Sequence, residues 1–463
     1  MSHKEAQKTK PLNVLVMAAG LGTRMKSNRA KVLHELGGRP LIAHVVRTAQ
    51  SLDPRTILVI VGHQAEEVEQ AVLAEVGELA SFAVQEKQRG TGDAVESARR
   101  QLEDSGSLVL LLSGDVPLIR GETLRKLIEQ HRATDAACTI LAVRLENPTG
   151  YGRIIRDEEG RFEKIVEQKD ASEEERKVRE INSGIYCFES GDLFAALKRI
   201  EPKNQQGEYY LTDVAEILNA SGRKVEVFIH TDARELSGIN TRAELAEFEN
   251  LLRRNAVRRL MLEAGVTFID PSHAYISPEA EIGRDTVIYP NVAIEGNTVI
   301  GENCVIRSGA RISNSKLGDN VTVKDHSLII DSEIASNCSV GPFAHLRMNA
   351  VLEEKATVGN FVEVKKSRLK RGTKAMHLTY LGDATIGERT NIGAGTVTCN
   401  YDGKHKHETI IEDDVKIGSD TMLVAPVRVG SRSVTGAGSV VTKDVPPDSL
   451  VAGVPAEVKK KLK

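Results

Sequence analysis

From residue 276 onward an aliphatic side chain recurs at every sixth position of the chain. The first run keeps this spacing without a miss: Ile276, Ile282, Ile288, Ile294, Ile300, Ile306 and Ile312. Small or compact residues form a second series four places later: Ala280, Thr286, Val292, Thr298, Cys304 and Ala310. Neither the 3.6-residue period of a helix nor the two-residue period of a single strand produces this pattern. It predicts a prism of short strands with the aliphatic residues stacked in one interior corner, which is a hexapeptide solenoid.

The aliphatic ladder continues nearly to the end of the chain, with two predicted interruptions. After one-residue slips it runs as Leu317, Val323, Ile329, Ile334, Val340, Leu346, Leu352, Val358 and Val364. It becomes irregular over residues 365–385 and again over 399–409, and the later members are Ile386, Ile392, Ile411, Ile417, Leu423, Val429, Thr435 and Val441. A regular scaffold often departs from its repeat where it accommodates binding or catalytic residues, so we expect functional residues at both places.

Composition limits the number of domains and the classes of function. A chain of 463 residues is too long for one hydrophobic core and indicates two or three domains. The net charge of -3 gives no electrostatic basis for nucleic-acid binding, and the terminal lysines are typical of a solvated tail. The first ten residues are polar and no stretch reaches the ~18 apolar residues of a membrane span, so we expect a cytoplasmic protein. The five cysteines lack metal or disulfide spacing, which favours core positions.

A glycine-rich loop follows the first predicted strand, residues 12–17. Its sequence, from Ala18 to Met25, lacks both the third glycine of a dinucleotide fingerprint and the Gly-Lys-Ser/Thr of a P-loop. Arg24 lies within the loop and Lys31 just after it. These two cations lie beside backbone N–H groups that a glycine-rich turn can direct at phosphate oxygens. Together they indicate phosphate binding.

Strands alternate with helical stretches from residue 56 to residue 131. This rhythm predicts a parallel, doubly wound α/β sheet, in which ligands bind beyond the carboxyl ends of the strands. The predicted strand ends carry Gly20, Gln85 with Gly90 and Thr91, and Ser113 with Gly114 and Asp115. A lone Asp115 would more simply cap a turn. Beside Arg24 and Lys31 it becomes a candidate ligand for Mg²⁺, which prefers one or two carboxylates plus substrate phosphates.

The domain boundaries follow from the composition of the middle of the chain. Past residue 144 the alternation gives way to a predicted hairpin that turns at residues 157–160 and leads to Glu167, which we expect to build a substrate lobe. The charged residues 172–180 predict a solvated helix or loop. Thr241 to Glu244 is a capping box that opens a helix ended by Gly265. We expect a tail at 1–10, a first domain at 11–240, a linker helix at 241–265 and the solenoid at 266–463.

Motifs across the whole first half resemble, in order, those of the sugar-1-phosphate nucleotidyltransferases. They are Gly20-Leu-Gly-Thr-Arg-Met, Lys31-Val-Leu-His, Gln85, Gly90-Thr-Gly, Gly114-Asp-Val-Pro, Pro148-Thr-Gly-Tyr-Gly-Arg, Glu167, Asn182-Ser-Gly and Asn240. With the solenoid, the chain most closely resembles the bifunctional bacterial family of N-acetylglucosamine-1-phosphate uridyltransferase and glucosamine-1-phosphate N-acetyltransferase. The resemblance implies a Rossmann-like nucleotidyltransferase domain, a left-handed parallel β-helix, a homotrimer, Mg²⁺, and glucosamine 1-phosphate, acetyl-CoA and UTP as substrates.

For uridylyl transfer the resemblance implies a site that draws on most of the first domain. Arg24 and Lys31 would neutralise phosphate charge, Asp115 and Asn240 would bind Mg²⁺, and no covalent enzyme intermediate is required. The implied nucleotide-binding and sugar-binding residues are Met17, Ala18, Ala19, Gly20, Lys31, Gln85, Gly90, Thr91, Ser113, Gly114, Asp115, Gly152, Glu167, Asn182 and Asn240. Of these, Gln85, Gly90 and Thr91 would hold uracil, whereas Gly152, Glu167 and Asn182 would hold the sugar.

For acetyl transfer the resemblance implies a site around the two interruptions. His377 would be the general base for the attacking amine, oriented by Glu363. The implied residues for glucosamine phosphate are Arg347, Lys365, Tyr380 and Asn391, and those for acetyl-CoA are Ala394, Asn400, Tyr401, Ser419 and Ala437. Without the resemblance, a lone histidine more often packs or lies at the surface, and Lys404 to His407 suits a solvated loop better than a metal site.

Three positions depart from the family's pattern. Ala30 stands where proline is usual and Ser113 where tyrosine is common, although neither change removes a charge. Gly453 lies near the place of a family arginine, which leaves open whether the tail contributes to a neighbouring subunit's acetyl-CoA site. The leading hypothesis is an enzyme with both activities. The alternative is a nucleotidyltransferase with one activity, whose solenoid serves only oligomerisation or regulation.

Overall fold

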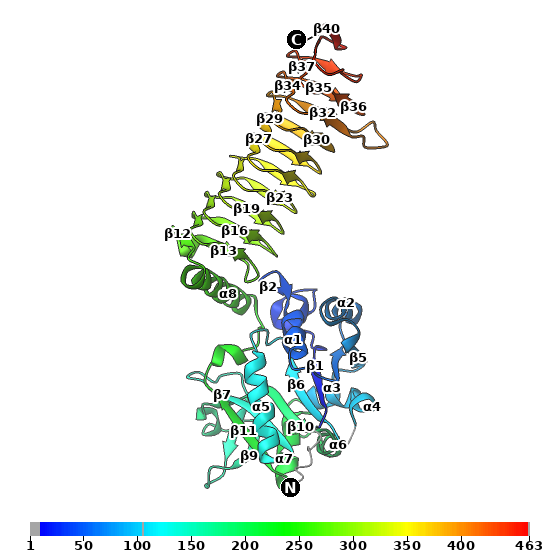
Figure 1. Cartoon of the computed structure of the whole chain (residues 1–463). Coiled ribbons are helices and arrows are strands. Elements are labelled where there is room, and N and C mark those ends of the chain that lie inside the picture. The colour runs from blue at the N-terminus through cyan, green and yellow to red at the C-terminus, as the bar shows by residue number, and fades with distance from the viewer. Residues whose placement is uncertain (1–9, 104–105, 462–463) are drawn as a thin grey trace, which may run out of the picture. The chain divides into compact units, whose positions relative to one another are not determined.

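The computed structural model describes residues 10–103 and 106–461, so the predicted tail at 1–10 lies almost wholly outside the described residues. The chain forms two compact units, Met1–Phe248 and Glu249–Lys463 (Figure 1). The division falls within α8 (Arg242–Glu263), whose predicted capping box is present. The N–H of Glu244 donates to Thr241 Oγ1 (3.2 Å), and Glu244 Oε2 accepts from the N–H of Thr241 (2.8 Å).

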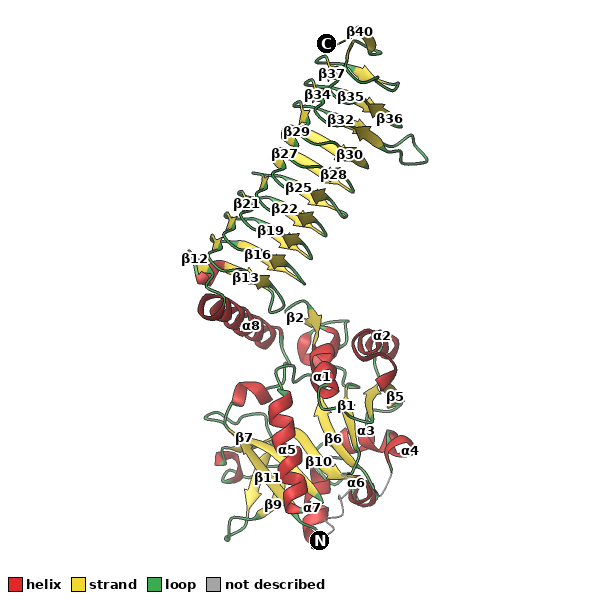
Figure 2. Cartoon of the chain, viewed as in Figure 1, coloured by secondary structure: helices red, strands yellow, loops and turns green. Residues whose placement is uncertain are grey.

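Unit 1 is built on one mixed sheet with the order β11-β7-β10-β6-β1-β4-β5 (Figure 2). Its parallel half consists of β1 (Leu12–Met17), β4 (Thr56–Val61), β5 (Ala80–Val84) and β6 (Leu108–Ser113). The other half consists of β7 (Cys138–Arg144), β10 (Glu180–Glu189) and β11 (Val225–His230), with β10 antiparallel to both of its neighbours. Apolar runs such as that of β6 suit strands that are buried on both faces.

Helices cover both faces of this sheet, which confirms the predicted doubly wound fold. Val14 and Val16 of β1 belong to one hydrophobic cluster and Leu15 to another, because alternate residues of a strand face opposite layers. The first cluster includes residues of α1 (Leu41–Gln50), α2 (Ala65–Val76) and α5 (Gly121–Thr134). The second includes residues of α3 (Thr91–Ser97), α4 (Arg99–Leu102), α6 (Ser190–Leu197) and α7 (Thr212–Ala220). α3 and α4 are two short helices that follow one another directly, within the stretch of residues 56–131 in which helices were predicted.

Smaller elements complete this unit. The predicted hairpin is β8 (Arg153–Arg156) and β9 (Phe162–Val166), joined by a turn in which Asp157 Oδ1 accepts from the N–H of Arg161 (2.8 Å). A second hairpin pairs β2 (Glu35–Leu36) with β3 (Arg39–Pro40). The 3-10 turns of the described residues are η1 (Thr23–Met25), η2 (Lys31–Leu33), η3 (Gly77–Leu79), η4 (Glu175–Lys177) and η5 (Ala233–Leu236) in unit 1 and η6 (Pro271–His273) in unit 2.

Unit 2 is a parallel β-helix with three rows of short strands (Figure 1). The first row is β12 (Thr267–Phe268), β15 (Val287–Ile288), β18 (Val305–Ile306), β21 (Thr322–Val323), β24 (Ser339–Val340), β31 (Asn391–Ile392), β34 (Lys416–Ile417), β37 (Val434–Thr435) and β39 (Ser449–Ala452). The second is β13 (Ala274–Ile276), β16 (Val292–Glu295), β19 (Arg311–Ser313), β22 (Leu328–Ile330), β25 (His345–Arg347), β32 (Val397–Cys399), β35 (Met422–Val424) and β38 (Val440–Val441). The third is β14 (Glu281–Ile282), β17 (Val299–Ile300), β20 (Lys316–Leu317), β23 (Glu333–Ile334), β26 (Val351–Leu352), β28 (Arg368–Leu369), β30 (Ala384–Ile386), β33 (Thr409–Ile411) and β36 (Val427–Val429).

Two longer strands, β27 (Thr357–Lys365) and β29 (Lys374–Gly382), run through both the first row and the second. The last strand, β40 (Glu457–Lys461), is exposed along its whole length and pairs antiparallel with β39. Three of the lysines predicted to form a solvated tail, Lys459 to Lys461, therefore belong to a strand, and Lys463 lies outside the described residues.

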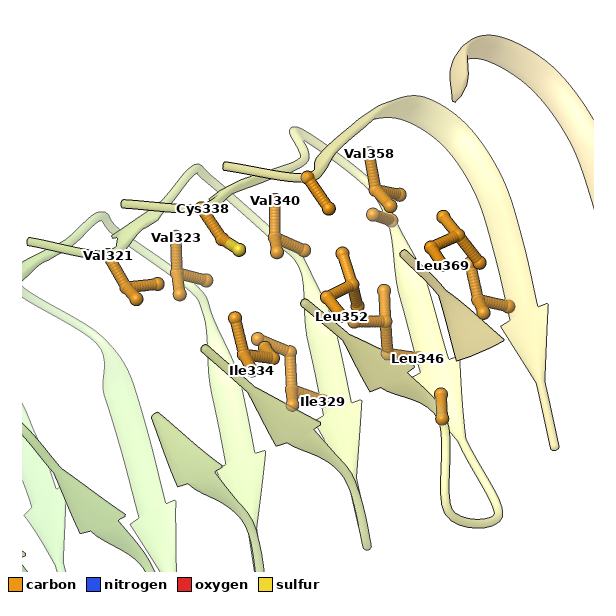
Figure 3. Packing of buried hydrophobic residues seen from close by; sticks show 14 of the residues in the cluster. Val321, Val323, Ile329, Ile334, Cys338, Val340, Leu346, Leu352, Val358 and Leu369 are labelled. Atoms are coloured by element: carbon orange, nitrogen blue, oxygen red, sulfur yellow. The ribbon is translucent and has the colours of Figure 1, made fainter. Parts of the chain in front are cut away.

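The predicted ladder forms the core of this unit. Every aliphatic member of the first run is buried, as are the small residues four places later. Figure 3 shows Val323, Val340 and Val358 stacked on successive coils, with Ile329 and Leu346 on the next face. At one outer corner Asp285, Asn303, Asn320 and Asn337 turn successive coils with positive φ, a conformation that aspartate and asparagine tolerate.

The first predicted interruption of the ladder is wrong. β27 and β29 pair in parallel from Thr357 and Lys374 to Lys365 and Gly382, and Leu369, Ala375 and Leu381 are fully buried in the same core. The rhythm is lost in the sequence because Leu369 follows Val364 by five residues and because Ala375 fills a position that larger aliphatic residues fill elsewhere.

The second interruption is confirmed. Ala384 pairs with Thr409, 25 residues later, whereas Val287 pairs with Val305, 18 residues later. The additional residues form a loop at 400–408 that projects from the prism beside β36 (Figure 2).

Four of the five cysteines are buried, in agreement with the predicted core positions, and Cys399 is half-buried. No helix among the described residues is long and apolar enough to cross a membrane.

Candidate active sites

A cavity of ≈ 330 Å³ lies at the carboxyl ends of β1, β5 and β6 in unit 1. The predicted residues that line it are Met17, Ala18, Ala19, Gly20, Lys31, Gln85, Gly90, Thr91, Ser113 and Asp115. It is also lined by Val32, Ile60, Gln88, Ala94 and Glu208, which sequence reasoning did not single out. The three predicted strand ends therefore meet at one cavity, as the topology of a doubly wound sheet requires.

Two cations and two oxygen donors meet at one end of this cavity. Lys31 Nζ forms an ion pair with Asp115 Oδ2 and donates to Asn240 Oδ1 (3.1 Å). Arg24 Nη2 donates to the same Asn240 oxygen (2.9 Å). Ser113 Oγ donates to Asp115 Oδ1 (2.6 Å), so the residue that replaces the family's tyrosine orients the carboxylate. Four residues from three distant parts of the chain thus form one charged cluster.

The donors in this cluster fit a magnesium ion. Asp115 offers a carboxylate and Asn240 an amide oxygen, and both contact Lys31. Among the described residues, no group of three or more His, Cys, Asp or Glu side chains could enclose a metal. Mg²⁺ is commonly held by one or two carboxylates, with waters and substrate phosphates as its other ligands. The residues present therefore suit an ion whose coordination is completed by the phosphates of a substrate.

Two glycines permit the close backbone approaches at this end. A Cβ on Gly22, whose φ is 59°, would lie 2.5 Å from the Cβ of Lys31. The N–H of Gly114 donates to the carbonyl oxygen of Met17 (2.9 Å), and a Cβ on Gly114 would lie 3.0 Å from that oxygen. Any larger residue would push Lys31 or the end of β6 away from the loop that follows β1.

The side of the cavity predicted to hold uracil is fixed by amide side chains. Gln85 Nε2 donates to the carbonyl oxygen of Gly90 (3.2 Å) and to Asp93 Oδ2 (3.1 Å). Gln88 Nε2 donates to the carbonyl oxygen of Ala19 (2.7 Å) and so joins this segment to the glycine-rich loop. Gln88 was not predicted, and only its position between Gln85 and Gly90 could have indicated it.

The three predicted sugar-binding residues lie together, outside the set that lines the cavity. The N–H of Asn182 donates to the carbonyl oxygen of Gly152 (2.9 Å), and a Cβ on Gly152 would lie 3.2 Å from Glu167 Oε1. Burial raises the pKa of Glu167, and the carboxylates of Asp170 and Asp213 raise it further. A carboxyl in this setting can accept or donate a hydrogen bond to a sugar hydroxyl.

Arg153 supports these residues and was not predicted to have a role of its own. Its side chain is buried, with Nη1 donating to the carbonyl oxygen of Tyr151 and Nη2 to Gln168 Oε1 (2.7 Å). Burial lowers the pKa of Arg153, whereas the nearby charge of Glu167 raises it. The guanidinium thereby fixes Tyr151, which precedes Gly152, and Gln168, which follows Glu167.

On the β-helix, the predicted phosphate-binding residues lie on the outer side of the second row. Arg347 pairs with Lys365 in the register of β25 and β27, and Arg347 Nε donates to Glu363 Oε1 (2.7 Å). Lys365 is buried, with Nζ 3.7 Å from Asp383 Oδ2. Asn400 Nδ2 donates to the same oxygen of Asp383 (2.6 Å). Asp383, which was not predicted, thus joins Lys365 to the base of the projecting loop.

His377 has a different partner from the one we expected. Its Nδ1 lies 2.7 Å from Asn360 Oδ1, directly across the parallel pair of β27 and β29. Glu363, the expected orienting residue, is hydrogen-bonded to Arg347. Because an amide oxygen can only accept, this contact places the proton on Nδ1 and leaves the lone pair of Nε2 for a substrate. The side chain is exposed, so Nε2 is accessible.

Tyr380 pairs with Glu363 in the register of β27 and β29, and its hydroxyl lies close to Gly382. A Cβ on Gly382 would collide with the Tyr380 hydroxyl and would lie 2.8 Å from Asn400 Nδ2. Glycine at this position therefore allows two predicted site residues to come together.

The projecting loop places a second lysine, Lys406, beside Lys365. The ammonium of Lys365 lowers the pKa of Lys406. Two facing ammonium groups are the arrangement that an anion between them would stabilise. The loop is held by Asp402, whose Oδ2 lies 2.7 Å from His407 Nε2, while Tyr401 is exposed with its hydroxyl donating to a main-chain oxygen of the same loop. A cavity of ≈ 500 Å³ lies between this loop and the third row, with Lys406 and Asp383 in its lining.

Three of the predicted acetyl-CoA residues form a column along one corner of the β-helix. The N–H of the residue that follows Ala394 donates to the carbonyl oxygen of Leu378 (3.1 Å). The N–H of the residue that follows Ser419 donates to the carbonyl oxygen of Ala394 (2.7 Å), and the N–H of the residue that follows Ala437 donates to that of Ser419 (2.8 Å). Leu378 follows His377 directly, so the column begins beside the histidine. Small residues along it leave the corner open to a long ligand.

Asn391 and Gly453 lie elsewhere on the β-helix. Asn391 begins β31, exposed and in register with Lys374 and Lys416. Gly453 has a φ of 106°, and its carbonyl oxygen accepts from the N–H of Val440 (3.1 Å). Glycine at this position serves the final turn of the β-helix, a need that an arginine would not meet.

The doubly wound unit with its cation-lined cavity and the hexapeptide β-helix define a nucleotidyltransferase joined to a hexapeptide-repeat transferase. Family models agree: nucleotidyl transferase matches residues 13–234, the GMPPB C-terminal domain 267–369, and the bacterial transferase hexapeptide (six repeats) 408–443. The bifunctional protein GlmU of Syntrophomonas wolfei is 46% identical over 439 residues, covering 95% of this chain and 96% of that protein. Those of Heliobacterium modesticaldum (49%, covering 94% of both chains) and Geobacter metallireducens (50%, covering 97% of both) are similar. The chain belongs to the bifunctional GlmU family and is an enzyme with two transferase activities, as the resemblance implied.

Proposed function

We propose that the cavity of unit 1 transfers a uridylyl group from UTP to N-acetylglucosamine 1-phosphate. An oxygen of the sugar phosphate attacks the α-phosphorus of UTP, the bond from that phosphorus to the bridging oxygen breaks, and pyrophosphate leaves. Both reactants are anions, so the site must neutralise charge and hold the groups in line. The observation that carries the proposal is the cluster of Arg24 and Lys31 with Asp115 and Asn240.

The residues of unit 1 divide this work by location. Arg24 and Lys31 contact the phosphates and stabilise the charge that develops on them. Mg²⁺, held by Asp115 and Asn240 when bound, supplies further neutralisation of the phosphate oxygens. Gln85, Gly90 and Thr91 hold uracil, whereas Gly152, Glu167 and Asn182 hold the sugar.

We propose that the β-helix transfers an acetyl group from acetyl-CoA to glucosamine 1-phosphate. Nε2 of His377 takes a proton from the amine as its nitrogen attacks the thioester carbonyl, the C–S bond breaks, and CoA leaves as its thiol. The contact between His377 and Asn360, which presents Nε2 in the basic tautomer, supports this role. Arg347 and Lys365 hold the sugar phosphate, Tyr380 contacts the sugar, and acetyl-CoA lies along Ala394, Ser419 and Ala437 with Asn400 and Tyr401 beside it.

We further propose that the β-helices associate as a homotrimer, and that the protein acts in the cytoplasm, where UTP and acetyl-CoA are made. Three rings are stacked along one corner: His326 on Phe343 (centroids 5.2 Å apart) and Phe343 on Phe361 (5.4 Å). Phe343 and Phe361 are 48% and 55% exposed, and both have positive φ. Bulky residues in that conformation are strained, which supports burial of this column against other copies of the chain. Light scattering should give three times the chain mass, and Phe361→Ser should lower it.

One assay tests both activities. Glucosamine 1-phosphate, acetyl-CoA, UTP and Mg²⁺ are supplied together, and free thiol and pyrophosphate are followed separately. His377→Ala should lose thiol release yet still form pyrophosphate when N-acetylglucosamine 1-phosphate is added. Asp115→Asn should release thiol normally and form no pyrophosphate. Wild-type enzyme that released no thiol but formed pyrophosphate from added N-acetylglucosamine 1-phosphate would favour the alternative, a nucleotidyltransferase whose β-helix serves oligomerisation or regulation only.

A further inference from the structure

Residues 204–213, here called the connecting segment, contact the side of the site predicted to hold uracil. The N–H of Gly92 donates to the carbonyl oxygen of Tyr209 (2.8 Å), and the N–H of Tyr209 donates to that of Arg89 (2.8 Å). The N–H of Leu211 donates to Thr91 Oγ1 (3.0 Å). Residues on both sides of Gly90 are therefore bonded to the connecting segment.

The contact is too close for independent movement. A Cβ on Gly90 would lie 2.5 Å from the carbonyl oxygen of Tyr209 and 2.8 Å from its nitrogen. A Cβ on Gly92 would lie 3.1 Å from the same oxygen. Arg89 adds a cation–π contact, with its guanidinium carbon 5.8 Å from the centre of the Tyr209 ring. A shift of the backbone around Gly90 must displace Tyr209 as well.

The other end of the connecting segment contacts the side predicted to hold the sugar. Gln206 Nε2 donates to the Tyr210 hydroxyl (2.5 Å), and Gln206 Oε1 accepts from Lys169 Nζ (2.5 Å). Asp170 Oδ1 accepts from the N–H of Gln205 (3.0 Å). The N–H of Asp170 in turn donates to the carbonyl oxygen of Glu167 (3.0 Å). The turn after Glu167 is therefore bonded to the same short segment.

Asn204 makes the segment rigid between these two ends. Its Oδ1 accepts from the N–H groups of Gln206 (3.2 Å) and Glu208 (3.1 Å), and its Nδ2 donates to the carbonyl oxygen of Glu208 (2.6 Å). Three hydrogen bonds from one side chain close this loop on itself. Glu208 also lines the cavity of unit 1, so the rigid part of the segment faces the nucleotide site.

We propose that the connecting segment couples the two substrates of uridylyl transfer, so that a bound UTP strengthens the binding of the sugar phosphate. UTP fixes the backbone around Gly90, Tyr209 is fixed with it, and Gln206 then holds Lys169 and the turn that positions Glu167. Gln206 is a positioning residue, because it acts through others and lies outside the predicted contacts with either substrate. This inference rests on the uridylyl-transfer site proposed above.

The coupling is measured as a ratio of two affinities. N-acetylglucosamine 1-phosphate is titrated into the full-length enzyme by calorimetry with Mg²⁺, alone and with a saturating UTP analogue whose α,β-bridge is methylene. We expect the analogue to strengthen binding of the sugar phosphate about 5- to 10-fold in the wild type. In Gln206→Ala that gain should fall to less than twofold, with binding of the sugar phosphate alone unchanged. Gly92→Ala should reduce the gain as well, because its added Cβ would crowd the carbonyl oxygen of Tyr209.

Gln205→Ala is the matched control, because Gln205 enters the network through its main-chain N–H and its gain should equal that of the wild type. If the wild-type affinity for the sugar phosphate is the same with and without the analogue, the coupling is refuted while the proposed function stands. An equal gain in Gln206→Ala and the wild type would also refute the role of the segment. If neither ligand binds the wild type, the proposed function itself fails. Thiol release by each variant shows that the β-helix is folded.

Discussion

The Nδ1 atom of His377 bonds to Asn360, while Glu363 is held by Arg347. His377 pairs directly with Asn360, and Glu363 lies three residues further along the same neighbouring strand. Asn360 and Glu363 can therefore each act on the imidazole. The hydrogen bond to Asn360 fixes the tautomer, whereas the carboxylate of Glu363 acts through charge and through Arg347. These two roles have different consequences when each side chain is made neutral or apolar.

Asn360→Leu should reduce acetyl transfer about fivefold, because the imidazole loses the one hydrogen bond that selects its basic tautomer, worth ~1 kcal/mol. Glu363→Gln should leave kcat within about threefold and raise KM for glucosamine 1-phosphate, since the amide holds Arg347 less tightly. Initial rates of thiol release separate the two constants. The reverse pattern would make Glu363 the orienting residue.

Asp213 gives unit 1 a pH-dependent stability. Burial, with the charges of Glu216 and Asp170, raises the pKa of Asp213 to about 6. The unfolded carboxyl titrates near pH ~3.9, so its contribution to stability is complete below that pH and is lost as pH rises through about 6. Asp213→Asn stays neutral and should be more stable than the wild type at pH 8 by ~1 kcal/mol, a value discounted for partial exposure.

This difference should appear in the melting transition that UTP shifts, as an increase of about 2–4 °C at pH 8 that shrinks as the pH falls from 6 toward 4. Asp53→Asn, a change at an exposed aspartate, is the control and should show no such trend. A constant difference at all pH values would mean that packing, not titration, causes the effect.

At the scale of elements, the regular parts of both folds were predictable and the irregular parts were not. Periodicity found the ladder because each coil of the β-helix must fill the same interior corner. The periodicity did not predict the regular coils between Val364 and Ile386, because a small residue, Ala375, fills a core position that is aliphatic and larger elsewhere. Contacts between distant segments, such as His377 with Asn360, depend on how β27 and β29 pair, which the sequence does not state. Gln88, Arg153 and Asp383 lie in the sites for the same reason and carry no motif of their own.

Deletion of residues 401–407 should separate the scaffold from its chemistry. The change returns the coil between Ala384 and Thr409 from 25 residues to 18, the length of a regular coil, so the β-helix should still fold. The deletion removes Lys406 from Lys365, and acetyl transfer should fall at least about 100-fold. Pyrophosphate formation from N-acetylglucosamine 1-phosphate should be unchanged.

A double replacement of Lys404 and His405 by alanine is the control, because both lie in the same exposed loop. It should retain more than half of the thiol release. Loss of the β-helix melting transition in the deletion variant would instead assign the loop a structural role.

At the scale of the whole molecule, the two units carry reactions in which the product of one is the substrate of the other. Each unit has its own hydrophobic core and its own site, so we expect the sites to work without sharing a chain. N-acetylglucosamine 1-phosphate formed on one chain should therefore reach the nucleotide site of another through solution.

An equimolar mixture of His377→Ala and Asp115→Asn should convert glucosamine 1-phosphate to UDP-N-acetylglucosamine after a lag. Neither variant alone should do so. The final rate should approach half that of wild type at the same total concentration, because half of each kind of site is active. Failure of the mixture, with both single activities intact, would indicate direct transfer within one chain or one oligomer.

β40 covers an end of the β-helix at which a second β-helix could otherwise pair. The terminal coil of a parallel β-helix leaves unpaired N–H and C=O groups, which are a template for another chain. β40 lies antiparallel on the final coil and presents Lys459, Lys460 and Lys461 in an exposed edge. Reversed strand direction and exposed lysine side chains both oppose the stacking of one β-helix on the next. We therefore expect β40 to oppose end-to-end growth of β-helices into filaments, a role set by where the strand lies rather than by any ligand.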